Sequence, residues 1–151
     1  MYFKIKRIQL RVKTRFKNSL TSGEKYQSEN ILEIVKVSEA AIYFKATLNF
    51  FNGHSCGIFG VADYRSNGKF VYDRSSENEE ANICRFAISL VRNTIHFDDL
   101  SSVCKARYCG ARGTLEGDYF QLKVRRPIKY MKIILNSKDY KQSLESFNAP
   151  K

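Results

Sequence analysis

Hydrophobic and polar residues alternate over much of the chain between residues 31 and 124. The clearest alternation starts at Ile42, where every second side chain up to Phe50 is apolar, with Lys45, Thr47 and Asn49 among those between. Successive side chains of a strand point to opposite faces, so this pattern predicts a strand with one buried face. By the same reasoning, strands are also predicted over residues 31–37, 56–64, 69–72, 84–90, 95–97 and 119–124.

Residue types that favour tight turns separate several of these predicted strands. Asn52-Gly53 and Ser66-Asn67-Gly68 are turn sequences, and Arg92-Asn93 lies between two alternating segments. Strands joined by short turns pair as antiparallel neighbours. The pattern therefore predicts an antiparallel meander or a small barrel-like sheet.

The hydrophobic period changes near the C-terminus. Between Pro127 and Leu135, apolar residues recur at the spacing of a helix, and Ser137 is suited to cap a second helix. The expected fold class is α+β, mostly β, with one or two short C-terminal helices.

The first 30 residues differ from the rest of the chain. They contain 8 basic and 2 acidic side chains, and residues 18–30 have the polar composition of a loop. The apolar residues of the first 17 positions are spread among cations, which fits a paired strand, a basic amphipathic helix or a disordered arm. The expected organisation is a basic arm with a polar loop (1–30), followed by a single β-rich domain with a helical tail (31–151).

Composition and charge narrow the class of protein. With 151 residues, 43% hydrophobic and 27% charged, the chain has the composition of one globular domain. Its net charge of +11 is concentrated at the two ends, which favours anionic partners, although ordinary surface solvation explains many cations equally well. No apolar run is long enough to span a membrane, and Met1–Lys17 lacks the apolar core of a secretory signal, so export would need a signal outside this chain.

Four cysteines are present: Cys56, Cys84, Cys104 and Cys109. An even number in a small β-rich domain favours two disulfides and an oxidising compartment such as the periplasm or the extracellular space. Of the three possible pairings, Cys56–Cys84 and Cys104–Cys109 are favoured, because the first would join neighbouring predicted strands and the second would close a four-residue loop. A zinc site and reduced core cysteines are the alternatives.

The sequence contains no recognisable combination of catalytic residues. His54 precedes Cys56 by two positions, but no third group is placed to orient a nucleophile pair, and Cys56 is expected in a disulfide. The carboxylates of residues 77–80 and 98–99 lie in predicted loops with no defined spacing, and no glycine-rich phosphate-binding loop is present. We expect no enzyme, no cofactor and no metal site.

Two basic segments are candidates for binding a partner. Arg112, in the CGARG turn, is of a residue type favoured at interface hot spots, and His54 is a further candidate. Arg125, Arg126 and Lys129 lie in a basic segment with an interleaved aromatic residue, a composition that suits nucleic acid but also an ordinary solvated helix face.

One set of motifs resembles a known family. GHSC (Gly53 to Cys56), GVA (Gly60 to Ala62), the downstream Cys84 and C-x4-CGARG (Cys104 to Gly113) resemble small bacterial envelope domains described as lysozyme-inhibitor-like. The resemblance covers about residues 31–145. It implies export to the periplasm, the disulfide pairing favoured above and a protein partner such as a cell-wall-degrading hydrolase or toxin.

The net charge of the chain argues against a simple lysozyme inhibitor. A chain of net charge +11 would be repelled by a basic lysozyme during encounter. The function expected from the sequence is therefore a non-catalytic periplasmic binding domain, an inhibitor or immunity protein against a cell-wall-degrading enzyme. The alternative is a basic module that binds an anionic envelope polymer or nucleic acid.

Overall fold

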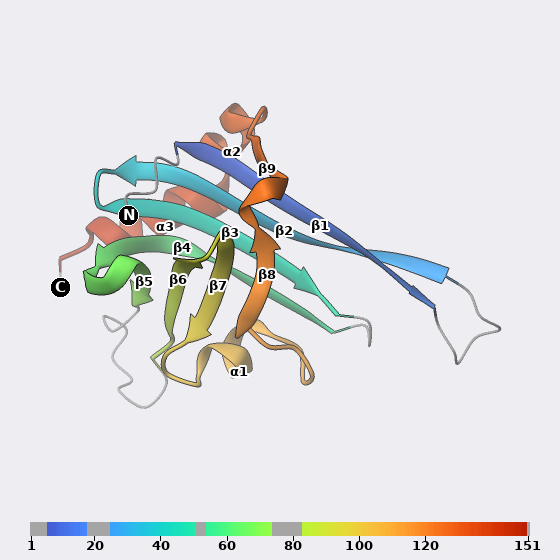
Figure 1. Cartoon of the computed structure of the whole chain (residues 1–151). Helices are drawn as coiled ribbons and strands as arrows, with labels where there is room; N and C mark the ends of the chain where they lie inside the picture. Colours follow the sequence, from blue (N-terminus) through green and yellow to red (C-terminus); the bar gives the residue numbers. More distant parts are fainter. Residues whose placement is uncertain (1–5, 18–24, 51–53, 74–82, 151) are drawn as a thin grey trace.

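The computed structural model describes residues 6–17, 25–50, 54–73 and 83–150. Across these residues one antiparallel sheet has the strand order β8-β7-β6-β5-β4-β3-β2-β1-β9 (Figure 1). Its strands are β1 (Arg7–Lys17), β2 (Lys25–Ser38), β3 (Ala41–Asn49), β4 (Ser55–Arg65), β5 (Lys69–Asp73), β6 (Arg85–Val91), β7 (Thr94–Asp99), β8 (Gly117–Gln121) and β9 (Arg125–Pro127).

The two ends of this strand order are joined by the chain itself. β8 and β9 are separated only by a short 3-10 turn (Leu122–Val124), yet β8 pairs with β7 while β9 pairs with β1. The sheet must therefore curl until its two edges nearly meet, which gives a nearly closed, barrel-like sheet (Figure 1). The predicted mostly β, antiparallel, barrel-like class is confirmed.

The inner face of the curled sheet holds the main hydrophobic core. Phe44 lies 5.7 Å from Phe86, and Phe86 lies 5.0 Å from Phe97, measured between ring centroids. Leu10 of β1 and Leu32 of β2 are fully buried in the same cluster. The interior of the barrel is thus packed with side chains from strands that are far apart in the sequence.

A second layer covers the outside of the sheet. Helix α3 (Lys138–Asn148) lies behind the strands of the sheet in Figure 1, and helix α2 (Met131–Asn136) precedes it near the top, beside β9. Ser137 caps α3, because its hydroxyl accepts a hydrogen bond from the Tyr140 amide at 3.2 Å, as the sequence predicted. A smaller core joins these helices to the sheet through Val35, Ala41, Tyr43, Val61, Ile128 and Ile134.

Tyr43 is the polar member of this second core and makes stability sensitive to alkaline pH. Burial, and then the negative charges of Asp139 and Glu33, raise the pKa of Tyr43 well above its ordinary value. The folded state therefore holds the neutral phenol, and this contribution to stability is complete below about pH 10. It is lost as pH rises further, because the unfolded tyrosine ionises first.

The free energy of unfolding should fall as pH rises above about 10, and one buried tyrosine can add up to about 1.4 kcal/mol per pH unit to that fall. We accordingly expect the fall to be less steep in Tyr43→Phe than in the wild type. Urea unfolding at about pH 8 and about pH 11 measures this difference. Tyr64→Phe is the matched control, because Tyr64 is 42% exposed. An equally steep fall in Tyr43→Phe and the wild type would contradict the assignment.

The N-terminal residues belong to the sheet. β1 pairs with β2 over its whole length, from Arg7 opposite Val35 to Lys17 opposite Lys25. Of the three conformations left open for this segment, the paired strand is therefore the one observed. The boundary expected at residues 30 and 31 falls inside β2, and the predicted loop over 18–30 extends too far, because β2 begins at Lys25. Arg7 and Arg11 are exposed, while Leu10 between them points into the core.

Other local predictions can be compared directly. The turn at residues 66–68 is confirmed, with Asn67 at φ 68°, and so is the turn at Arg92-Asn93, where φ is 52° and 68°. The strand predicted over 119–124 ends at Gln121. A short helix, α1 (Cys104–Tyr108), was not predicted. The predicted turn at 52–53 and the carboxylates of 77–80 lie outside the described residues.

Candidate functional site

All four cysteines form disulfides, but the favoured pairing was wrong. The bonds join Cys56 to Cys109 and Cys84 to Cys104, with Cα–Cα distances of 4.0 and 4.7 Å. Cys56 and Cys84 are not on neighbouring strands, because β5 lies between β4 and β6 in the sheet. Cys104 and Cys109 lie at opposite ends of α1, which directs each toward a different strand. No cysteine remains for a zinc site or as a free thiol.

The turn after α1 packs tightly against the start of β4. A Cβ atom at Gly113 would lie 2.8 Å from the Cys56 sulfur, and one at Gly110 would lie 2.9 Å from His54 Nδ1. The Gly110 amide donates a hydrogen bond to the Ser55 carbonyl at 2.9 Å. The two glycines thus let the turn close over His54 and the disulfide, and they leave Arg112 exposed at its tip.

Positive charge gathers where β9 pairs with β1. Arg126 lies opposite Gln9, and Arg125 lies opposite Leu10. Residues 6–17 carry six cations and no acid, and residues 122–132 carry five cations and no acid. This pairing therefore brings the start of β1 beside β9, and the only charges in either segment are positive. We call the exposed cations of these two segments the basic surface: Lys6, Arg7, Arg11, Lys13, Lys123, Arg125, Arg126, Lys129 and Lys132.

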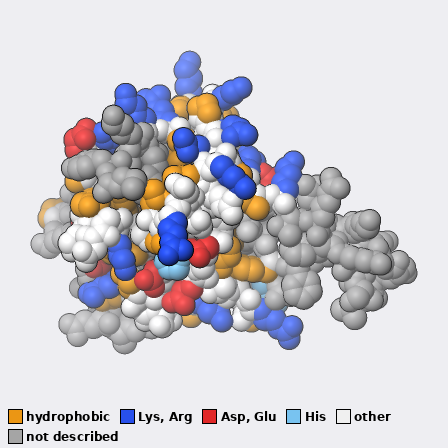
Figure 2. Space-filling model, in the orientation of Figure 1, with side chains coloured by type: hydrophobic (Ala, Val, Ile, Leu, Met, Phe, Trp, Pro, Cys, Tyr) orange, Lys and Arg blue, Asp and Glu red, His pale blue; other side chains and the backbone are white. Residues whose placement is uncertain are grey.

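The basic surface occupies one side of the molecule. Figure 2 shows Lys and Arg side chains gathered at the top, over β1, β9 and α2. The guanidinium groups of Arg125 and Arg126 donate to the backbone carbonyls of Leu122 and Arg125, at 3.3 and 2.8 Å. Backbone carbonyls do not neutralise a cation, so both groups keep their charge for a partner.

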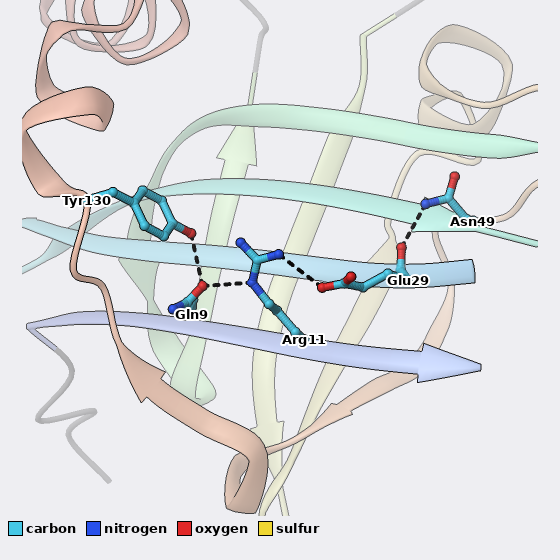
Figure 3. A network of polar contacts seen from close by, with 5 residues as sticks. All are labelled: Gln9, Arg11, Glu29, Asn49 and Tyr130. Carbon is cyan, nitrogen blue, oxygen red and sulfur yellow. Dashed lines mark hydrogen bonds and ion pairs between the residues drawn. The ribbon is translucent and has the colours of Figure 1, made fainter. Parts of the chain in front are cut away.

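A chain of hydrogen bonds holds the basic surface in shape (Figure 3). The Gln9 Oε1 atom accepts hydrogen bonds from the Tyr130 hydroxyl at 3.0 Å and from Arg11 Nε at 2.9 Å. Arg11 Nη1 bonds Glu29 at 3.0 Å, and this bond is the main cause that raises the pKa of Arg11. Asn49 Nδ2 donates to the Glu29 carbonyl at 2.7 Å. The start of α2 is thereby tied to β1, β2 and β3.

A polar cluster that the sequence did not reveal lies on the outside of β6, β7 and β8. Ser89 pairs with His96 across the strands, and His96 Nδ1 lies 2.8 Å from Asp118 Oδ1. These residue types form nucleophilic triads in hydrolases. Around Ser89, however, β6 is paired with β5 on one side and β7 on the other, so the nearby amides serve the sheet instead of forming an oxyanion hole. We interpret the cluster as polar side chains that pair across neighbouring strands and stabilise the sheet.

The binding residues expected from the sequence fall into two separate groups. Arg125, Arg126 and Lys129 come together and join the cations of β1, a convergence that sequence reasoning missed although both basic segments were visible in it. His54 and Arg112 belong to the region where the turn after α1 packs against the start of β4. Figure 1 shows α1 at the bottom of the molecule and β9 at the top.

Within the described ranges, no cluster of three or more His, Cys, Asp or Glu side chains could hold a metal ion. The helices described are all too short or too polar to cross a membrane. Comparison with known proteins gave no significant match to any family model, curated protein or solved structure. The resemblance to lysozyme-inhibitor-like domains thus stays a prediction.

Proposed function

We propose that this protein is a non-catalytic binding module that acts outside the cytoplasm and holds an anionic partner on its basic surface. The observation that carries the proposal is the pairing of β9 with β1, which turns two basic ends of the sequence into one continuous cationic region. Such a region attracts polyanions over a Debye length and releases their counterions on contact.

The arrangement of these cations favours a binding surface over cations that only keep the protein soluble. Nine exposed cations gather on one side, eight of them outside the Arg11–Glu29 ion pair, and the hydrogen bond between Tyr130 and Gln9 ties the start of α2 to β1. A pre-ordered cationic surface loses little conformational entropy when it binds, so more of the electrostatic attraction is retained as affinity. Location outside the cytoplasm is supported by the two disulfides, which persist in oxidising compartments.

Neutralising part of the basic surface tests the proposal. We expect Arg125→Gln/Arg126→Gln/Lys129→Gln to weaken binding to dextran sulfate at least about tenfold at low salt. Its plot of log affinity against log salt should also be less steep, by about one unit for each cation that contacts the polymer. Isothermal titration over a series of salt concentrations measures both quantities.

The matched control is Lys105→Gln/Arg107→Gln/Arg112→Gln, three exposed cations in and after α1. Both triple variants lower the net charge by the same amount, from +11 to +8. The control should bind nearly as tightly as the wild type. Equal weakening in both variants would show that net charge, and not this surface, governs binding.

The other partner expected from the sequence, a cell-wall-degrading enzyme, stays a prediction. The feature that would serve it is the turn of residues 109–113, which the Cys56–Cys109 bond anchors and which exposes Arg112. Inhibition of a lysozyme or a peptidoglycan amidase by the purified protein would support it, and no inhibition across a panel of such enzymes would remove it.

A further inference from the structure

Helix α2 exposes large aliphatic side chains beside the basic surface. Ile133 is 72% exposed, more than any other large hydrophobic residue among those described, and Leu135 is 40% exposed. Ile134 between them is buried against the sheet. Successive helical residues are about 100° apart, so Ile133 and Leu135 flank α2 while Lys132 points outward.

Cations lie in and immediately before the helix that carries this apolar pair. Lys129 precedes α2, Lys132 lies within it, and Arg125 and Arg126 belong to β9 immediately before it. At the top of Figure 2, hydrophobic side chains are visible between Lys and Arg side chains over this region. The molecule therefore presents aliphatic groups and positive charge together on one protruding turn.

We propose that the anionic partner is the surface of a phospholipid bilayer, and that Ile133, the more exposed of the two aliphatic side chains that flank α2, inserts between the lipid headgroups. This inference rests on the proposed function, because it names the partner of the same basic surface. Lys129, Lys132, Arg125 and Arg126 contact the anionic headgroups, while the aliphatic side chains reach the boundary of the acyl chains.

A bilayer fits this combination better than a hydrophilic polymer does. Proteins that bind single-stranded nucleic acid stack its bases on aromatic side chains, and isoleucine offers no such platform. An anionic bilayer supplies both negative charge and an apolar phase within about 5–10 Å of the surface. Each headgroup contact and each buried aliphatic side chain then adds to the same interaction.

The turn is held so that Ile133 does not fold back onto the protein. The Tyr130 hydroxyl bonds Gln9 at 3.0 Å at the start of α2, and Ile128 and Ile134 pack against Val35, Tyr43 and Val61. Insertion then requires no rearrangement of the fold, so little of the binding free energy is lost to ordering.

Vesicle binding by two matched double variants tests the inference. We expect the wild type to co-sediment with vesicles of phosphatidylcholine and phosphatidylglycerol but not with pure phosphatidylcholine. Ile133→Ser/Leu135→Ser should bind the anionic vesicles about tenfold more weakly, yet bind dextran sulfate as the wild type does. Val91→Ser/Leu100→Ser, which removes two side chains of 51% and 46% exposure at other sites, should leave both affinities unchanged.

A fluorescent reporter distinguishes insertion from simple adhesion. The chain contains no tryptophan, so Ile133→Trp introduces a single indole. Its emission should shift to the blue with anionic vesicles and be quenched by brominated lipids, whereas that of Val91→Trp should not change.

Dextran sulfate binding without vesicle binding would overturn the inference and leave the proposed function intact, with a soluble polyanion as partner. Vesicle binding that the serine pair does not weaken would also overturn it. Failure to bind either ligand would overturn both proposals.

Discussion

Replacement of Cys56 and Cys109 by alanine is expected to lower the free energy of unfolding by about 4 kcal/mol. This bond joins residues 53 positions apart, and in the chain-entropy description a longer closed loop removes more freedom from the unfolded state. The Cys84–Cys104 bond spans 20 positions, so replacing both of its cysteines by alanine should lower the free energy of unfolding by about 3 kcal/mol. Urea unfolding of both variants under non-reducing conditions measures the difference.

The same bonds predict a specific peptide map. Proteolysis of the unreduced protein should release one linked pair containing Cys56 and Cys109 and another containing Cys84 and Cys104. The intact native protein should weigh about four hydrogens less than the reduced one, since each disulfide removes two. Peptides that link Cys56 to Cys84 would contradict the structure, and four free thiols would contradict both the structure and the argument for an oxidising compartment.

Phe44→Ala should lower the free energy of unfolding by about 3–5 kcal/mol, because it leaves a cavity among the aromatic rings of the barrel interior. The Phe44 side chain is fully buried, and its ring lies 5.6 Å from Tyr72 and 5.7 Å from Phe86. Neighbours on β5 and β6 are held by their own strand pairing and can collapse only partly into the space. The midpoint and slope of urea unfolding give this loss.

Tyr64→Ala provides the matched control, because Tyr64 is also aromatic and packs against Phe70 at 5.5 Å but remains 42% exposed. It should cost well under half as much. Dextran sulfate binding by folded Phe44→Ala should be unchanged, because β2 separates β3 from the strands that carry the basic surface. A small loss of stability in Phe44→Ala would mean that the interior is less tightly packed than the structure shows.

The stability of the barrel matters for the proposed function because the basic surface needs β9 to pair with β1. That contact is short, from Ile8 opposite Pro127 to Leu10 opposite Arg125, and it closes the curled sheet. The basic surface therefore exists only while the sheet is folded and closed, and a variant that stays folded keeps it.

The sequence alone determined those features whose causes are local. Alternation from Ile42 to Phe50 predicted β3, because burying one face of a strand needs an apolar residue at every second position. Ser137 was identified as a helix cap, and Arg92-Asn93 as a hairpin turn, because each acts on the backbone within a few residues. The mostly β antiparallel class followed from adding such signals together.

Only the tertiary structure decided the features that depend on distant residues meeting. The favoured disulfide pairing was wrong because β5 separates the strands near Cys56 and Cys84, and strand order is not a local property. The sequence does not decide the conformation of β1, because Arg7 and Arg11 obscure the alternation around Leu10. The basic surface itself exists because closing the barrel places Arg125 and Arg126 beside β1, more than 100 residues away in the chain. Local sequence patterns set the charge of each segment, but packing and sheet closure decide which segments become neighbours.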